Sequence, residues 1–212
     1  MSVRERPLSS AVRGLICCAA LWLYACSNTT FTSTWKAPGA QRVDPTGKSI
    51  AALVIYSDKK RRRDAEVYLA NDITTRGARG VAAYTLLGLD GYPSVDYARA
   101  RFKEAGVEGV VIMRLVAHDQ TVIVDPGGFS GSAYTSFGSY YSSYGMSVSY
   151  STGSVQTDTQ VTIETLIYSL NQDKLLWAGT SRTGNPEGLQ SLINEVADAV
   201  SGQLAKQGLV AR

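Results

Sequence analysis

A single cysteine stands at the end of an apolar leader near the start of this chain of 212 residues. Three arginines precede an apolar run from Leu15 to Ala25, and Cys26 follows that run directly. A basic start, an apolar stretch of about 7–15 residues and small residues before the cut are typical of a secretory signal peptide. A cysteine placed directly at the cut sets this leader apart from an ordinary signal peptide.

The sequence Leu23-Tyr24-Ala25-Cys26 resembles the bacterial lipobox. The resemblance implies that Cys26 receives diacylglycerol, that the signal peptide (residues 1–25) is removed and that the new amino terminus is acylated. Ser27 after the cysteine implies export to the outer membrane. A membrane-spanning helix is excluded, because crossing a bilayer needs about 20 apolar residues. An ordinary signal peptide is disfavoured, since the other cysteines lie inside the leader and leave Cys26 without a disulfide partner.

The net charge of +3 falls mostly on the leader, which carries three arginines and Glu5. The remaining residues, 26–212, are therefore close to neutral and long enough for one well-packed domain. A nearly neutral domain that is exported to the cell envelope is not expected to bind nucleic acid. We expect contact with the membrane through the lipid, an envelope protein or a second copy as partner, and no cofactor.

Five consecutive basic residues form the densest charge in the chain: Lys59, Lys60, Arg61, Arg62 and Arg63. They stand where a strand gives way to a helix, and the free N–H groups of a helix start favour anions. An anion-binding site for lipid headgroups or an acidic polymer is one interpretation. The other is a solvated helix face balanced by Asp58 and Asp64.

No motif for catalysis or metal binding stands out. His118 is the only histidine, and no Gly-x-Ser-x-Gly elbow supplies a nucleophile. The tripeptide Gly47-Lys48-Ser49 imitates a phosphate loop but precedes a strand instead of opening a helix. Carboxylates such as Asp119 and Glu164 occur singly. We therefore predict no catalytic residue, no metal site and no enzymatic activity.

The elements that would position these residues follow from apolar periodicity and from turn residues. Strands are predicted over residues 50–55, 81–87, 107–124, 155–170 and 174–182. Three helices are predicted between and after them, with Asp58, Ser94 and Asn185 as their N-caps. Glycines end them: Gly77 or Gly80, then Gly106, then Gly208. The order β-α-β-α-β-β-β-α predicts a single α/β domain with a mixed sheet, in which two crossover units precede a meander.

The predicted domain, residues 49–210, would be periplasmic and separate from its anchor. Residues 27–47 are rich in Ser, Thr, Pro and Gly without helical periodicity. We predict a lipid anchor and flexible tether over residues 26–48, with at most a short extended piece at residues 33–35.

Four short sequences within residues 50–208 carry a further resemblance: Tyr56-Ser57-Asp58, Tyr84-Thr85-Leu86-Leu87, Glu108-Gly109-Val110-Val111 and Lys174-Leu175-Leu176-Trp177-Ala178. With the lipobox and the element order, they resemble a family of bacterial outer-membrane lipoproteins. The order also resembles the amino-terminal domain of periplasmic TolB and the core of the curli-secretion lipoprotein. These are packing and turn signals, so the resemblance implies a fold and a location and not a chemistry.

The long third and fourth strands are joined by a segment of unusual composition. Residues 126–157 contain no charged side chain, and residues 126–154 hold 10 Ser, 6 Gly and 5 Tyr. A low-complexity loop is one interpretation. A hairpin that pairs with a neighbouring subunit is the second. A strand pair of a membrane barrel is the third, although its outward residues would be mostly Ser and Gly.

Together these features predict a non-catalytic lipoprotein on the periplasmic side of the outer membrane, with a role in envelope assembly or protein interaction. The alternative is a module that binds an anionic envelope ligand through residues 59–63. A third reading is a subunit of an oligomeric secretion channel of the curli type.

Overall fold

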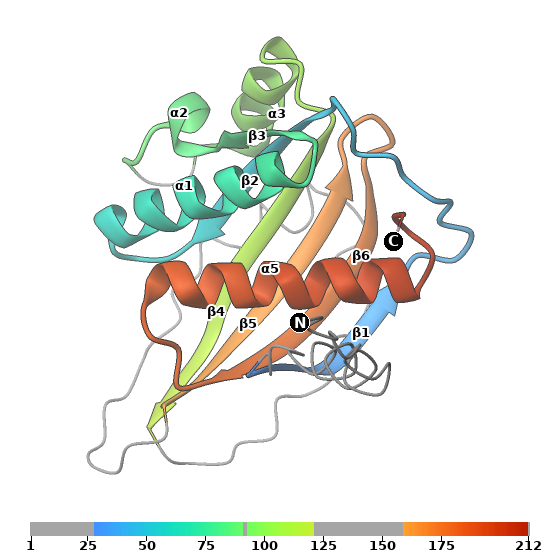
Figure 1. Ribbon diagram of the computed structural model, residues 1–212. Helices are drawn as coiled ribbons and strands as arrows, with labels where there is room; N and C mark the ends of the chain where they lie inside the picture. The colour runs from blue at the N-terminus through green and yellow to red at the C-terminus, as the bar shows by residue number, and fades with distance from the viewer. Residues whose placement is uncertain (1–27, 91–92, 121–158, 212) are drawn as a thin grey trace, which may run out of the picture.

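A six-stranded mixed sheet forms the centre of the fold (Figure 1). The computed structural model describes residues 28–90, 93–120 and 159–211. Its elements in chain order are β1 (Thr29–Lys36), β2 (Ser49–Ile55), α1 (Lys59–Thr75), β3 (Arg79–Ala82), α2 (Tyr84–Leu87), α3 (Val95–Glu104), β4 (Gly109–Gln120), β5 (Thr159–Ser169), β6 (Lys174–Gly184) and α5 (Leu189–Lys206). The prediction of an α/β domain with a mixed sheet is confirmed.

The strand order is β1-β6-β5-β4-β2-β3. β2 pairs in parallel with β3 and with β4, while β4, β5, β6 and β1 are antiparallel neighbours. The parallel part comes from the two crossover helices α1 and α3, because parallel strands need long connections. The predicted division into crossover units and a meander is thus observed.

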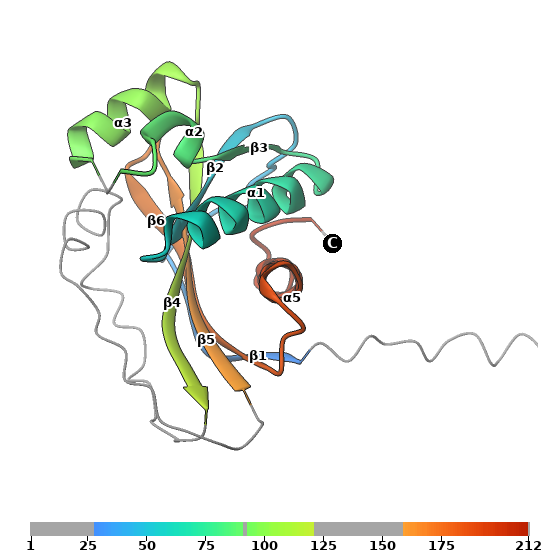
Figure 2. The same cartoon turned by 90° about the vertical axis from the view of Figure 1, so that its left-hand side faces the viewer.

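Helices cover the two faces of the sheet unequally (Figure 2). The long helices α1 and α5 lie on one face, and the shorter α2 and α3 lie on the other. β2 is buried on both faces: Ala52 and Val54 pack toward α1 and α5, whereas Ala51 and Leu53 pack on the opposite side. This explains why its sequence is continuously apolar instead of alternating.

Two of the three predicted N-caps are confirmed. The Asp58 carboxylate accepts the N–H of Arg61 at 2.9 Å, and the Ser94 hydroxyl accepts the N–H of Tyr97 at 3.4 Å. At the end of α1, Gly77 adopts a φ of +94° directly after the C-cap Arg76. Gly77 therefore ends this helix. None of the described helices is long and apolar enough to cross a membrane.

The predicted tether is wrong over its first part. Residues 29–36 form β1, which pairs antiparallel with β6, and the following Ala37 is buried. The Ser- and Thr-rich sequence hid this strand, because β1 lies at the edge and buries little apolar surface. Thr29 and Thr183 share a buried hydroxyl–hydroxyl hydrogen bond of 2.7 Å in place of an apolar contact.

The predicted strand 81–87 is wrong over its second half. β3 ends at Ala82, and Tyr84–Leu87 form the single helical turn α2, which Gly88 closes with a φ of +77°. These apolar residues form a helical turn instead of continuing the strand. The reason is that the N–H of Tyr84 donates to a buried carboxylate on α1 and not to a neighbouring strand.

The predicted N-cap Asn185 is also wrong. α5 begins at Leu189 after Gly188, and no side chain caps it. Asn185 instead adopts a φ of +47° and bonds to β5: its N–H donates to the Thr159 carbonyl at 2.8 Å, and its Oδ1 accepts the N–H of Thr159 at 2.9 Å.

Several predictions lie outside the described residues. They are Cys26 with its signal peptide, the segment 126–154, and the strand ends predicted at residues 121–124 and 155–158.

Candidate functional site

The five basic residues at the start of α1 do not converge on one site. Arg62 is only 4% exposed, and its Nη2 donates to the Gly88 carbonyl at 3.1 Å, which ties α1 to the end of α2. Lys59 points elsewhere and pairs with Asp90 at 2.8 Å. This hydrogen bond with the lysine lowers the pKa of the exposed Asp90 carboxyl.

The next two cations share one partner. Lys60 and Arg63 each lie 3.5 Å from an oxygen of Asp64, on the exposed side of α1. Exposed pairs of this kind contribute about 0–1 kcal/mol. For Lys60 and Arg63, these contacts favour a solvated helix face over an anion-binding site.

Arg61 is the exception among the five, because it borders a cavity. Its Nη1 lies 3.4 Å from the Tyr56 hydroxyl, and both residues line a groove of about 390 Å³ between the starts of α1 and α5. We call this the helix-start groove. Its other lining side chains are mainly aliphatic and include Met113, Leu115, Val161 and Leu189. His118, the only histidine, also lines it.

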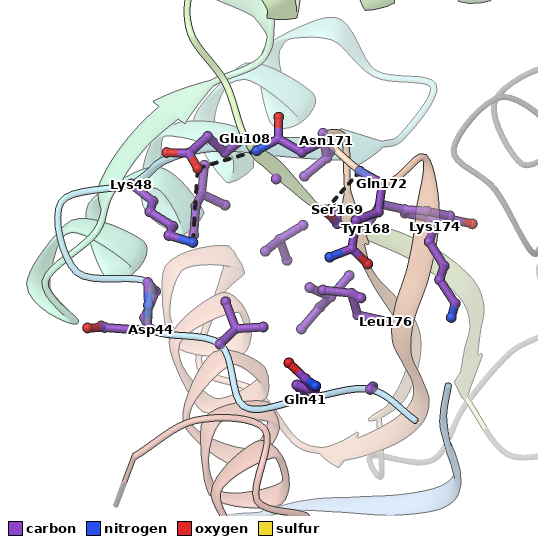
Figure 3. A pocket seen from close by; sticks show the side chains of 18 of the residues that line it. Gln41, Asp44, Lys48, Glu108, Tyr168, Ser169, Asn171, Gln172, Lys174 and Leu176 are labelled. Carbon is purple, nitrogen blue, oxygen red and sulfur yellow. Dashed lines mark hydrogen bonds and ion pairs between the residues drawn. The ribbon is translucent and has the colours of Figure 1, made fainter. Parts of the chain in front are cut away.

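A second cavity of about 400 Å³ lies at the opposite end of the sheet (Figure 3). The segment 37–48, which joins β1 to β2, crosses it as a strap. The strap is fixed to the fold through its backbone: the N–H of Ala37 donates to Leu176 at 3.0 Å, and that of Val43 donates to Leu209 at 2.7 Å.

The strap cavity has an aliphatic floor and a polar rim. Ile50, Val111, Ile167 and Leu176 form the floor. At the rim, Glu108 lies 4.0 Å from the Lys48 ammonium and accepts from the Asn171 amide at 3.4 Å, as Figure 3 shows. This arrangement can bind a small polar group, but the described lining includes no histidine or cysteine that could act as a base or nucleophile.

A buried carboxylate that the sequence analysis missed joins α1 to the sheet. Glu66 is 1% exposed, and its two oxygens accept the N–H groups of Val54 at 3.2 Å and of Tyr84 at 2.6 Å. Burial raises the pKa of Glu66 to about 7, against the lowering effect of these two hydrogen bonds and of the Arg62 charge. One signal could have revealed it: Glu66 falls on the apolar face of α1, beside Ala65 and Leu69.

A largely buried charged pair also lies in the sheet. Arg114 on β4 and Glu164 on β5 face each other across the ladder, and Arg114 Nη2 lies 2.7 Å from Glu164 Oε2. Within the described residues, no group of three or more His, Cys, Asp or Glu could hold a metal ion. The contacts of Glu66 join α1 to β2 and α2, and the Arg114–Glu164 pair joins β4 to β5.

Comparisons with known proteins show no family for this chain. No model of a protein family matches it, and no curated protein matches it in sequence. Solved structures are similar at low identity. A PelC dodecamer from Paraburkholderia phytofirmans is 10% identical, with a TM-score of 0.46, over 87% of this chain and 99% of that chain.

Two further solved structures show a similar arrangement. A single-residue variant of the same PelC dodecamer is 12% identical, with a TM-score of 0.47, over 80% of this chain and 95% of that chain. The lipoprotein GNA1162 from Neisseria meningitidis is 14% identical, with a TM-score of 0.40, over 75% of this chain and 99% of that chain. These likenesses assign neither a family nor a function.

Proposed function

We propose that this chain is a lipid-anchored, non-catalytic envelope protein whose domain acts by interaction through its outer strand β1. The observation that carries the proposal is the position of β1. It begins at Thr29, three residues after Cys26, and it forms one edge of the sheet. Anchor and interaction surface would then be one continuous piece of chain.

The short distance between Cys26 and the fold supports anchoring close to the membrane. Three residues span at most about 10 Å. The fold has already begun at Asn28, whose carbonyl accepts the N–H of Gly184 at 3.2 Å. A lipid on Cys26 would therefore hold the start of β1 at the bilayer surface, and Ser27 favours the periplasmic face of the outer membrane.

The edge itself supports an interaction role. β1 has eight residues, whereas the opposite outer strand β3 has four. An outer strand presents backbone N–H and C=O groups that can pair with a strand of another chain. The side chains of Thr30 and Thr32 are exposed along it. The partner would be an envelope protein or a second copy of this chain.

β1 is held firmly enough to act as a template. The ring of Phe31 packs edge-on against Trp177, with centroids 5.7 Å apart. Gln207, after α5, accepts from Trp177 Nε1 at 3.1 Å and donates to the Thr34 hydroxyl at 3.2 Å. The aromatic contact and the amide bridge therefore fix β1 to β6 and to the end of α5.

Anchoring is tested by the mass of the amino-terminal peptide and by membrane fractionation. The wild-type peptide should begin at Cys26 and carry diacylglycerol and an acyl chain, and Cys26→Ser should lose the modification. Unmodified Cys26 in protein extracted from membranes would overturn the anchor.

The edge is tested with the double variant Thr30→Lys/Thr32→Lys, because charges along an edge oppose strand addition. Asn71→Lys on the exposed side of α1 is the matched control. The complex is measured by cross-linking in intact membranes and then by light scattering in detergent. We expect a complex for the wild type and for the control, and no complex for the double variant. A complex that survives in the double variant would remove β1 from the proposal.

A further inference from the structure

The helix-start groove has the lining expected for one apolar chain and one negative charge. Its floor and walls include Val54, Met113, Leu115, Val161, Ile163 and Leu189. Among the described lining residues, Arg61 is the only arginine or lysine, and none is a carboxylate. The two acids nearest to Arg61 along the chain have other partners: Asp58 caps the N–H of Arg61, and Asp64 lies 3.5 Å from both Lys60 and Arg63.

The volume of the groove limits what can occupy it. About 390 Å³ falls within the range of sites for small molecules, roughly 300–1,000 Å³. A protein partner needs a far larger contact, with about 800 Å² buried on each side. The groove therefore suits an amphiphile better than a second folded chain.

Hydrogen bonds fix the mouth of the groove to the place where the anchor leaves the domain. Asn28 accepts from Gly184, and the next residue, Asn185, exchanges two hydrogen bonds with Thr159, which lines the groove. His118, near the end of β4, and Gly188, before α5, line the same mouth. A bilayer that holds the start of β1 would thus lie beside the groove.

From these three observations we infer that the helix-start groove binds an anionic phospholipid of the anchoring membrane. One acyl chain would lie along the aliphatic floor, and the Arg61 guanidinium would pair with the phosphate, which it can bind through two parallel N–H groups. This inference rests on the proposed lipid anchor, since the anchor is what brings the groove to the bilayer.

The experiment uses the acylated wild-type protein in vesicles of phosphatidylcholine and phosphatidylglycerol. A small fraction of the phosphatidylglycerol carries a photoactivatable group on its acyl chain. After flotation and illumination, mass spectrometry locates the cross-linked residues. We expect them to concentrate on groove residues such as Met113, Leu115 and Leu189.

Three matched variants separate the groove from general surface charge. Arg61→Gln should lower the yield of groove cross-links about tenfold or more, because it removes the charge-assisted hydrogen bonds to the phosphate. Lys60→Gln and Arg63→Gln remove the same charge from the same helix turn, but neither residue lines the groove. These two should lower the yield by at most about fivefold each, because they lose only the general attraction of one charge to an anionic surface.

The possible outcomes are distinct. Protein that fails to float with vesicles contradicts the anchor and hence the proposed function. Protein that floats but gives cross-links scattered over its surface, or an equal loss in all three variants, overturns the groove while leaving the anchor intact. In a separate sample, a photoactivatable residue in place of Leu189 that cross-links one protein chain to another would assign the groove to a second copy and overturn the lipid.

Discussion

Glu66 accepts a hydrogen bond from the backbone N–H of Tyr84 over 2.6 Å, across 18 residues of chain. Its other oxygen accepts the N–H of Val54, in the part of β2 that extends beyond its pairing with β3. Where β3 stops, this one carboxylate on α1 accepts the β2 N–H that a neighbouring strand would otherwise accept. It also accepts the first N–H of the helical turn α2.

The buried Glu66 carboxyl predicts a pH-dependent stability. Its pKa is about 7 in the folded chain because of burial, against an ordinary value of 4.5. Between these values the folded state binds more protons, so the free energy of unfolding falls as pH rises. The fall is on the order of 3 kcal/mol.

Glu66→Gln isolates this effect, because glutamine does not titrate. Urea unfolding at pH 4.5 and pH 8 should show the wild type losing stability relative to the variant by that amount. Glu187→Gln, at an exposed position, is the control and should follow the wild type. A difference between wild type and Glu66→Gln that does not change with pH would contradict the raised pKa.

Close packing of α1 on β3 predicts that Gly80→Ala is destabilising. A Cβ at Gly80 would lie 1.9 Å from the backbone carbonyl oxygen of Ala70. The helix would have to move, at a cost of about 2–3 kcal/mol in the free energy of unfolding. Gly202→Ala in α5, where a Cβ would meet no atom within 4 Å, should instead stabilise by about 0.5–1 kcal/mol. Thermal unfolding of the two variants should shift in opposite directions.

The buried pair Arg114–Glu164 predicts strong coupling between the two side chains. Their side chains are 23% and 7% exposed, so removing the carboxylate leaves a largely buried charge. Glu164→Leu should cost about 3 kcal/mol, and the double variant Arg114→Leu/Glu164→Leu should recover most of the loss. Chemical denaturation of both singles and the double measures this. Additive costs would show that the pair is not coupled.

The side-chain amide of Gln207 bonds to both Trp177 and Thr34, so we predict that its removal destabilises the pairing of β1 with β6. Gln207→Ala leaves the indole N–H of Trp177, a fully buried residue, without its acceptor, which costs about 1–3 kcal/mol. Hydrogen exchange should increase in residues 29–36 more than in β4 or β5. Gln203→Ala, in the last turn of α5, is the control. Equal protection of β1 in both variants would show that the bridge does not hold the strand.

The sequence correctly predicted the elements whose structure follows from a local pattern of apolar and capping residues. The buried strand β2, the caps Asp58 and Ser94 and the meander β4–β6 follow from local patterns. β1 was missed because an edge strand made of Ser and Thr resembles a linker until its partner β6 is known. α2 was missed because its first N–H is satisfied by Glu66, 18 residues away.

The candidate site was predictable only in part. The sequence identified the basic cluster but not which of its cations lines a cavity, since the partners of Lys59 and Arg62 come from the α2 region, more than 20 residues away. Of the five, Arg61 alone lines the helix-start groove, which is formed by described residues from β2, α1, β4, β5 and the start of α5. Such a convergence depends on tertiary contacts that no local pattern encodes.

The position of β1 also decides how the domain bears a load. Tension applied through the residues before Thr29 enters the sheet along β1, whose partner β6 runs antiparallel beside it. Force along the strand axis shears the ladder, so its hydrogen bonds resist together instead of opening one after another. If Cys26 carries a lipid and β1 binds a partner, as proposed, the same strand would bear the load and recognise the partner. Force on the anchor would then reach that partner without passing through the core.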